Sequence, residues 1–195
     1  MFNIAYAQYL KGDFDISKSF RFDDRNSLAL HFGVGVAYPY GNSTILPYEK
    51  RYFSGGANSV RGWSVRELGP GRFTGGDGRI DFINQTGDIK FEANLEYRFP
   101  ILGDLHGATF LDAGNVWLLR YDKSRPGGQL KWGRFLKDLA LGTGIGLRYD
   151  LTFLVIRLDW GIGLHVPYDT GKKGYYNIPD FKDGMGVHLA IGYPF

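Results

Sequence analysis

Apolar and polar residues alternate with period two along several segments of this chain. The alternation is clearest at the carboxyl end, where one row is wholly apolar and the opposite row is rich in glycine. The apolar row contains Met185, Val187, Leu189, Ile191, Tyr193 and Phe195. Successive side chains of a β-strand point to opposite faces, so the segment predicts a strand with one apolar face. Segments of about ten or more residues are longer than most globular strands and match a tilted bilayer crossing.

Six further segments carry the same pattern. They span residues 7–22, 28–38, 89–99, 106–117, 139–150 and 154–166. The first could be one long strand or a loop followed by a strand, and residues 106–117 place apolar side chains on both faces. The opposite rows are rich in glycine, including Gly33, Gly35, Gly142, Gly144, Gly146, Gly161 and Gly163. We expect these rows to line an interior, so that Gly161→Ser is mild, and the apolar rows to face lipid.

The connections between the segments alternate in length. Short connections are predicted at residues 23–27, 100–105 and 151–152, and long ones at residues 40–87, 118–138 and 167–183. A barrel of the outer membrane has tight turns on its periplasmic rim and long loops outside. The sequence therefore predicts an all-β fold, an antiparallel transmembrane β-barrel, with residues 1–195 in one domain.

Composition excludes several other classes of protein. The 195 residues include no Cys, and the formal net charge is +3 with Lys and Arg spread along the chain. This argues against a disulfide scaffold, a Cys-ligated metal and a nucleic-acid partner. The four His residues lack metal spacing, and Ser54 and Ser59 lack a nucleophile elbow. We predict no metal, no cofactor and no enzyme activity.

The most informative motif lies in the long loop of residues 40–87. Val60, Arg61, Gly62 and Trp63 follow a glycine-rich run. A guanidinium inside a barrel needs carboxylate partners, which its fork of donors suits. Glu96 and Asp112 lie where strand periodicity allows them to face the same interior. The alternative is a solvated arginine and two ordinary polar residues of the wall.

Such an anchor would offset the entropy lost when a long loop is ordered. Gly62 and the pair Gly55 and Gly56 are expected to let the loop backbone turn tightly. Arg148, Asp150, Arg157 and Asp159 fall on predicted interior rows. We expect them to form a ladder of ion pairs rather than acid and base chemistry.

The run from Phe53 to Trp63, with residues 68–71, resembles the sixth extracellular loop of the BamA/TamA outer-membrane protein superfamily (bacterial surface antigen). Three more matches follow in the order of that family, at residues 94–100, 110–117 and 142–148. The resemblance implies that Arg61 reaches into the lumen and pairs with Asp112 and Glu96. It also implies about seven or eight strands of a barrel that has roughly sixteen when complete.

The same resemblance implies a place in the bacterial outer membrane and a role in inserting outer-membrane proteins or exporting proteins. Its partners would be the lipid bilayer, unfolded outer-membrane protein clients and periplasmic accessory proteins. The amino-terminal residues lack the features of a signal peptide, and about seven strands is an odd number for a bacterial barrel. We therefore expect the chain to be the carboxyl-terminal portion of a larger barrel.

The last residues also resemble a known signal. Leu189, Ile191, Tyr193 and Phe195 are similar to the carboxyl-terminal β-signal by which outer-membrane proteins are recognised for assembly. Gly192 and Pro194 would weaken the final strand, because proline cannot donate to a ladder. The alternative reading is a complete eight-stranded barrel with a structural or adhesion role, whose interior would have little room for the long loop.

Overall fold

The computed structural model describes residues 6–75 and 83–195, and within these ranges seven antiparallel strands form one sheet in chain order. The strands are β1 (Tyr9–Arg21), β2 (Ser27–Pro39), β3 (Ile89–Leu102), β4 (Leu105–Trp117), β5 (Ala140–Asp150), β6 (Val155–His165) and β7 (Met185–Ile191). Short 3-10 helices lie in the long connections: η1 (Tyr48–Lys50), η2 (Trp132–Asp138) and η3 (Phe181–Gly184). The all-β antiparallel fold predicted from the sequence is confirmed.

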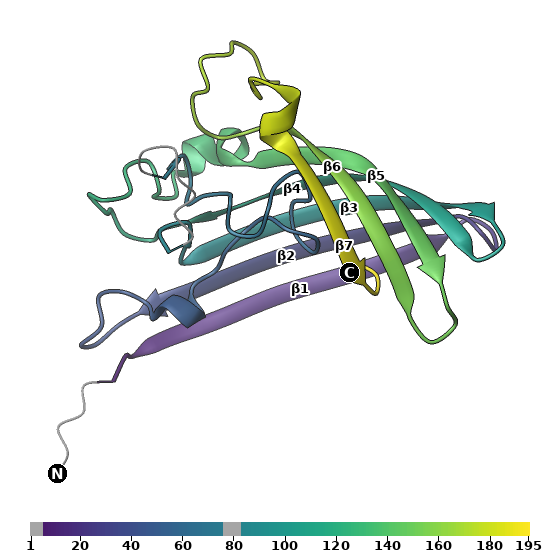
Figure 1. Ribbon diagram of the computed structural model, residues 1–195. Helices are drawn as coiled ribbons and strands as arrows, with labels where there is room; N and C mark the ends of the chain where they lie inside the picture. The colour runs from purple at the N-terminus through teal and green to yellow at the C-terminus, as the bar shows by residue number, and fades with distance from the viewer. Residues whose placement is uncertain (1–5, 76–82) are drawn as a thin grey trace.

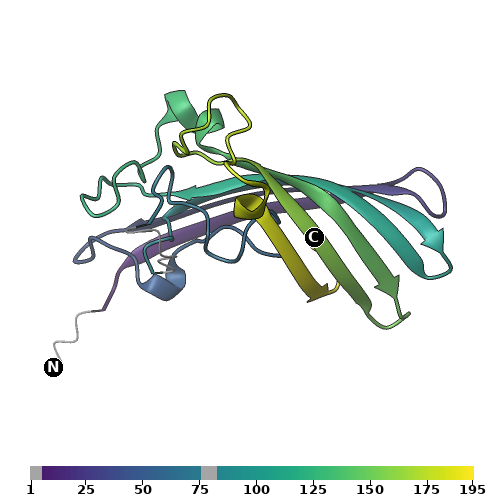
Figure 2. The same ribbon diagram turned by 45° about the horizontal axis from the view of Figure 1, so that its top comes forward.

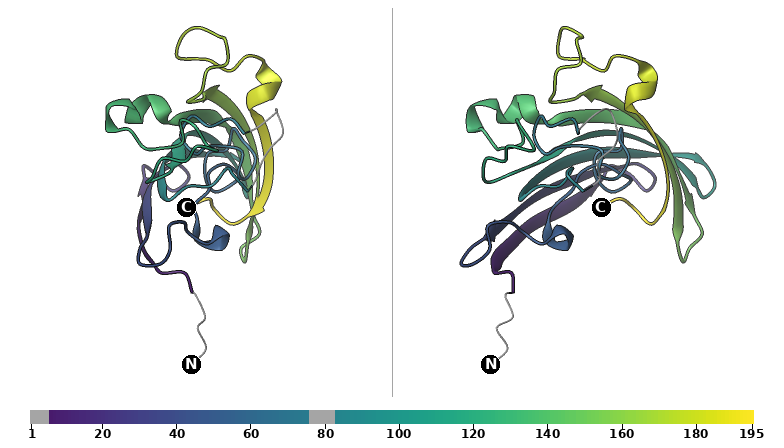
Figure 3. Two further views of the ribbon diagram at one scale, coloured as in Figure 1. Left: turned by 90° about the vertical axis from the view of Figure 1, so that its left-hand side faces the viewer. Right: turned by 60° about the vertical axis from the view of Figure 1, so that its left-hand side comes forward.

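The sheet curls along its width, and the loop between β2 and β3 lies on its concave side (Figures 1 and 3). Long connections gather at one end of the strands and tight turns at the other, as Figures 1 and 2 show. By the general rule for outer-membrane barrels, the end with long loops faces outward. Among the described residues β1 and β7 each pair on one side only. None of the helices in this part of the chain has the length and hydropathy needed to cross a membrane.

The two faces of the sheet differ as the period-two pattern predicts. On β6, the inward residues Asp159 and Gly161 are buried, whereas the outward side chains of Leu158 and Trp160 are about two-fifths exposed. The loop covers the inward row from β2 to β6 and leaves both faces of β1 accessible. On the inner face, apolar surface is therefore buried where the loop packs against the strands. On the outer face, the apolar row is the surface that lipid would cover.

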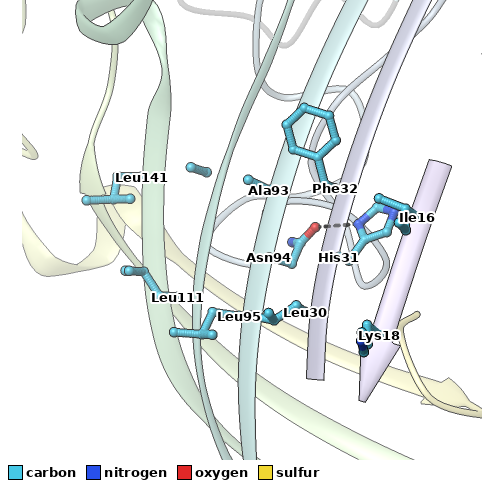
Figure 4. Close-up of a pocket in the computed structure, with 11 residues that line it drawn as sticks. Ile16, Lys18, Leu30, His31, Phe32, Ala93, Asn94, Leu95, Leu111 and Leu141 are labelled. Carbon is cyan, nitrogen blue, oxygen red and sulfur yellow. Dashed lines mark hydrogen bonds between the residues drawn. The ribbon is translucent and has the colours of Figure 1, made fainter. Parts of the chain in front are cut away.

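The outer face carries a shallow apolar hollow of about 500 Å³ across β1 to β5 (Figure 4). Ala93 and Ala113 are register partners at its centre, and their small side chains leave space between larger neighbours. The rim includes Leu95, Leu111 and Leu141. This composition is that of a lipid-facing surface.

The carboxyl end departs from the predicted strand. We expected one outward row to continue to Phe195, but β7 ends at Ile191, where Gly192 has a φ of +85°. The Tyr193 ring then lies 4.1 Å from the Arg98 guanidinium, and Phe195 stacks on His31 with ring centroids 5.3 Å apart. The left-handed residue turns the chain out of the ladder, and the proline that follows cannot rejoin it.

The face assignment predicts how β6 tolerates charge. Leu158→Arg places a cation on the outer face between the periplasmic end and the middle of the strand, so we expect it to destabilise the barrel by about 1 to 2 kcal/mol. Phe153→Arg, in the adjacent tight turn, should cost less than about 1 kcal/mol, because charge is tolerated near the interface. Urea unfolding of the full-length protein in lipid vesicles measures both. Equal costs would contradict the assigned membrane depth.

Candidate functional site

The loop enters the lumen as a folded-back segment between Ser54 and Leu68, which form a β-bridge. The amide of Gly56 donates to the carbonyl of Trp63 over 2.8 Å and closes the turn. Gly55 and Gly56 have φ values of +95° and +94°, and a Cβ on Gly55 would lie 2.2 Å from the Ser64 carbonyl oxygen. Both positions therefore need glycine, for conformation and for space.

Arg61 lies at the tip of this segment and is completely buried. Its Nε and Nη2 donate to the two carboxylate oxygens of Asp112 over 2.7 and 2.8 Å, and its backbone N–H donates to the same carboxylate over 3.1 Å. Nη1 donates to Glu96. The guanidinium centre also lies 3.6 Å from the centroid of the Phe110 ring. The structure thus brings together Arg61, Asp112 and Glu96, with a two-pronged pairing that lysine could not reproduce.

The ion cluster is larger than the three residues singled out by the motif. Asp159 on β6 lies 3.8 Å from Arg61, and it pairs with Arg148 and Arg157 over 2.6 and 2.9 Å. Arg148 also donates to Glu96 over 2.9 Å. The sequence placed Arg148, Arg157 and Asp159 on inward rows but did not connect them to Arg61.

Further contacts tie the cluster to the rest of the loop. Arg157 donates to the carbonyl of Ala57 over 2.8 Å and to the side chain of Asn58. Asp150, the fourth member of the predicted ladder, lies outside it and accepts the amide of Thr152 in the tight turn. The expected ladder is therefore corrected to three of its four residues, because Asp150 ends β5 at the turn and not in the lumen.

Pairing explains how so much charge is buried in one place. Arg61, Arg98, Arg148 and Arg157 surround Glu96, Asp112 and Asp159, and Arg98 donates to Glu96 over 2.8 Å. An ion buried without a partner is costly. Removal of one partner from a buried pair therefore typically costs about 3 to 5 kcal/mol. The arrangement joins loop, β3, β4, β5 and β6 through hydrogen-bonded ions. It can hold a loop in one position.

Glycines on the wall provide the surface on which the loop rests. A Cβ on Gly161 would lie 1.9 Å from the carbonyl oxygen of Arg61, and one on Gly163 would lie 2.7 Å from the Trp63 ring. The expectation that Gly161→Ser is mild is therefore wrong, because the loop backbone occupies the place of the side chain. Gly62 is also reinterpreted: it lacks a left-handed φ, and a Cβ there would lie 2.9 Å from the amide nitrogen of Gly163. The absence of a side chain at Gly62 lets the loop backbone lie close to the backbone of β6.

Apolar packing and the last strand complete the contacts of the motif. Val60 and Trp63 are buried in one cluster with Leu68, Ala140 and Val166. His188 on β7 has its Nε2 3.0 Å from the carbonyl oxygen of Arg61, so the loop also contacts the edge strand.

The four residues resembling a β-signal are divided between two environments. Leu189 and Ile191 are about three-quarters exposed on the outer row, whereas Tyr193 and Phe195 contact Arg98 and His31. In residues 6–75 and 83–195, no three His, Cys, Asp or Glu side chains gather as metal ligands would.

The comparison with protein families decides the family of this chain. Residues 5–195 match the Omp85 superfamily domain. The chain belongs to the Omp85 superfamily. It is thus a protein of the bacterial outer membrane with a β-barrel architecture, as the sequence predicted.

Two of the relatives found by sequence comparison are proteins of the same name from different bacteria. The chain is 33% identical over 109 residues to "Outer membrane protein assembly factor BamA" of Neisseria meningitidis serogroup B, an alignment that covers 53% of this chain and 12% of the relative. It is 29% identical over 143 residues to the protein of the same name from Nitratidesulfovibrio vulgaris, covering 72% and 16%. The aligned part is therefore a small fraction of each relative.

Solved structures support the fold alone. BamA from Haemophilus ducreyi lacking POTRA domains 1–3 superposes with a TM-score of 0.65 at 17% identity, covering 94% of this chain and 34% of that one. CdiB from Acinetobacter baumannii gives a TM-score of 0.53 at 19% identity, covering 96% and 27%. Both likenesses extend over nearly the whole chain.

Proposed function

We propose that this chain is the part of an outer-membrane protein assembly factor that carries the lumenal loop and one edge of its barrel. The observation that carries the proposal is the Arg61 loop, buried against five strands of a sheet whose family includes named assembly factors. Its partners would be the lipid bilayer, unfolded outer-membrane protein clients and periplasmic accessory proteins. No covalent chemistry is required.

The mechanism rests on the sheet edge. β7 has seven residues where the other strands have 11 to 14, and its last ladder contact is the amide of Gly192 with the carbonyl of Val155 at 2.7 Å. An edge with unpaired N–H and C=O groups templates an incoming strand by β-augmentation. The loop would brace the wall beside this edge, through the contact between Arg61 and His188, while the edge opens. The role of residues 189–195 as a β-signal is part of the same proposal.

Two further candidate functions are weighed against this one. Protein export is favoured by the likeness to CdiB only at the level of fold. A complete eight-stranded barrel with an adhesion role is disfavoured, because such an interior is nearly filled by its own side chains. Here Val60, Arg61 and Trp63 of the loop take up that space.

The test uses the full-length protein in lipid vesicles and a urea-denatured small outer-membrane barrel as client. We expect the client to fold faster than in protein-free vesicles, as followed by its heat-modifiable gel migration. Arg61→Gln should remove most of the acceleration, with Arg134→Gln, a half-exposed residue of η2, as the control. Transport of a passenger across the vesicle membrane without client folding would favour export, and no effect on either would contradict both functions.

A further inference from the structure

A polar cavity lies at the outward end of the sheet, lined by other residues than those of the Arg61 cluster. It has a volume of about 480 Å³ between the end of β2, the start of the loop after it and the loop that follows β4. Its lining includes four cations and two carboxylates, namely Arg51, Arg120, Lys123, Arg125, Asp88 and Asp122. The excess of positive charge indicates an anionic ligand.

The two carboxylates have different partners within the protein. Asp122 accepts the hydroxyl and the amide of Ser124 and pairs with Arg125 over 2.9 Å, and these contacts, Ser124 first, hold its pKa at about 2. Asp88 accepts the amide of Leu119 over 3.0 Å. Arg125 in turn donates to the carbonyl of Thr86 over 3.1 Å. Asp122 and Arg125 thus balance each other, and the charge of Asp88 acts on Arg51, Arg120 and Arg125. Two carboxylates face four cations, so the cavity keeps an excess of positive charge.

Three cations remain without a carboxylate partner in the described part of the chain. Arg51 donates its Nε to the carbonyl of Leu46 over 3.1 Å, and Arg120 makes only long contacts of 3.3 and 3.4 Å to carbonyl oxygens. Lys123 is exposed. Burial and the charge of Arg125 lower the pKa of Arg51, whereas the charges of Asp88 and Asp122 raise it, and the net direction is downward.

The cavity lies at the level of the membrane interface. The Arg120 guanidinium is 5.5 Å from the ring centroid of Tyr38, which stands half exposed on the outer row of β2. Tyr40 and Tyr121 are also at least half exposed at this rim. Aromatic residues of this kind form the belt at headgroup level, where lipid phosphates lie.

We propose that this cavity binds a phosphate monoester, with Arg51 and Arg120 as paired donors and Lys123 as an additional cation. Guanidinium groups recognise phosphate oxygens by two parallel hydrogen bonds, and basic pockets at membrane rims accept lipid headgroups. The position at the outer rim suits the phosphate of an outer-leaflet glycolipid. A soluble phosphate would use the same chemistry.

The experiment measures ligand binding to the full-length protein in detergent by native mass spectrometry, with phosphorylated lipid A, dephosphorylated lipid A and inorganic phosphate as separate probes. The double variant Arg51→Gln and Arg120→Gln should weaken phosphorylated lipid A binding at least tenfold. Lys173→Gln removes one charge from the loop before β7 and should change binding less than twofold. Heat-modifiable migration establishes that each variant is folded.

Each outcome decides the assignment. Loss in the double variant, with dephosphorylated lipid A bound weakly by wild type, supports a glycolipid phosphate. Binding of inorganic phosphate alone, with the same dependence on Arg51 and Arg120, supports the site and assigns it a soluble ligand. Binding that is unchanged in the double variant, or equal for lipid A with and without phosphate, overturns the proposal.

Discussion

Arg61→Gln is expected to release the loop from the lumen of the full-length protein. The substitution keeps a polar side chain, shorter than that of arginine, and leaves Asp112 and Glu96 without their shared cation. Because those carboxylates are buried, the free energy of local opening at Arg61 to Trp63 should fall by about 3 to 5 kcal/mol. Amide hydrogen exchange measures this opening directly, since exchange through local unfolding reports the stability of one segment.

A control variant separates the effect of losing the buried Arg61 cluster from the effect of losing a positive charge elsewhere. Arg134 on η2 lies 3.6 Å from Asp138, and its side chain is 44% exposed whereas that of Asp138 is 3% exposed. The ion pairs of the Arg61 cluster include neither residue, so Arg134→Gln should change the local opening free energy of residues 61–63 by less than about 1 kcal/mol. Unchanged exchange at residues 61–63 in Arg61→Gln, or an equal effect of both variants, would show that packing alone holds the loop.

A double-mutant cycle tests the pairing itself. Arg61→Gln and Asp112→Asn should be non-additive by at least about 1 kcal/mol, because the two groups share their hydrogen bonds. A reversed pair, with aspartate at 61 and arginine at 112, is a weaker test. Glu96 and Asp159 also lie beside Arg61 and would repel a carboxylate placed there. If the effects of the two single variants were additive, Arg61 and Asp112 would not be energetically coupled, and the proposed pairing would be contradicted.

The period-two pattern predicted most of the fold because the alternation within each strand shows which residues face inward and which face outward. Its irregularity at residues 106–117 now has a cause. Phe110 and Val116 point inward yet are apolar, since one lies against Arg61 and the other packs with Tyr52 of the loop. An inward apolar residue is a signal that something other than water fills the lumen there.

The membership of the ion cluster required strand register, which the sequence does not reveal. Asp112 stands opposite Asn94 on β3, and that amide donates to it over 2.9 Å. Arg148 and Asp159 come together only because Gly146 is the partner of Asp159 across β5 and β6. The end of β7 was mispredicted for another reason: alternation continues to Phe195, but the backbone of Gly192 leaves the ladder.

Gly161→Ala tests the contact between the loop and the strands without changing any charged residue. The added Cβ would meet the carbonyl oxygen of Arg61 at 1.9 Å and its carbonyl carbon at 2.4 Å. These are backbone atoms, which cannot rotate away as a side chain can, so the loop must move or the strand must bend. We expect a loss of about 3 kcal/mol in the local opening free energy of residues 61–63, at the upper end for overpacking.

Gly142→Ala is the control, on the same inward surface. Its Cβ would have no neighbour closer than 3.4 Å, an ordinary contact, so exchange at residues 61–63 should stay near the wild-type rate. The amides that pair β5 with β6 should also stay protected in Gly161→Ala, because the obstruction lies between wall and loop. If those amides exchanged as fast as the loop, Gly161 would be needed for the pairing of β5 with β6. Loop docking would then depend on the Arg61 cluster alone.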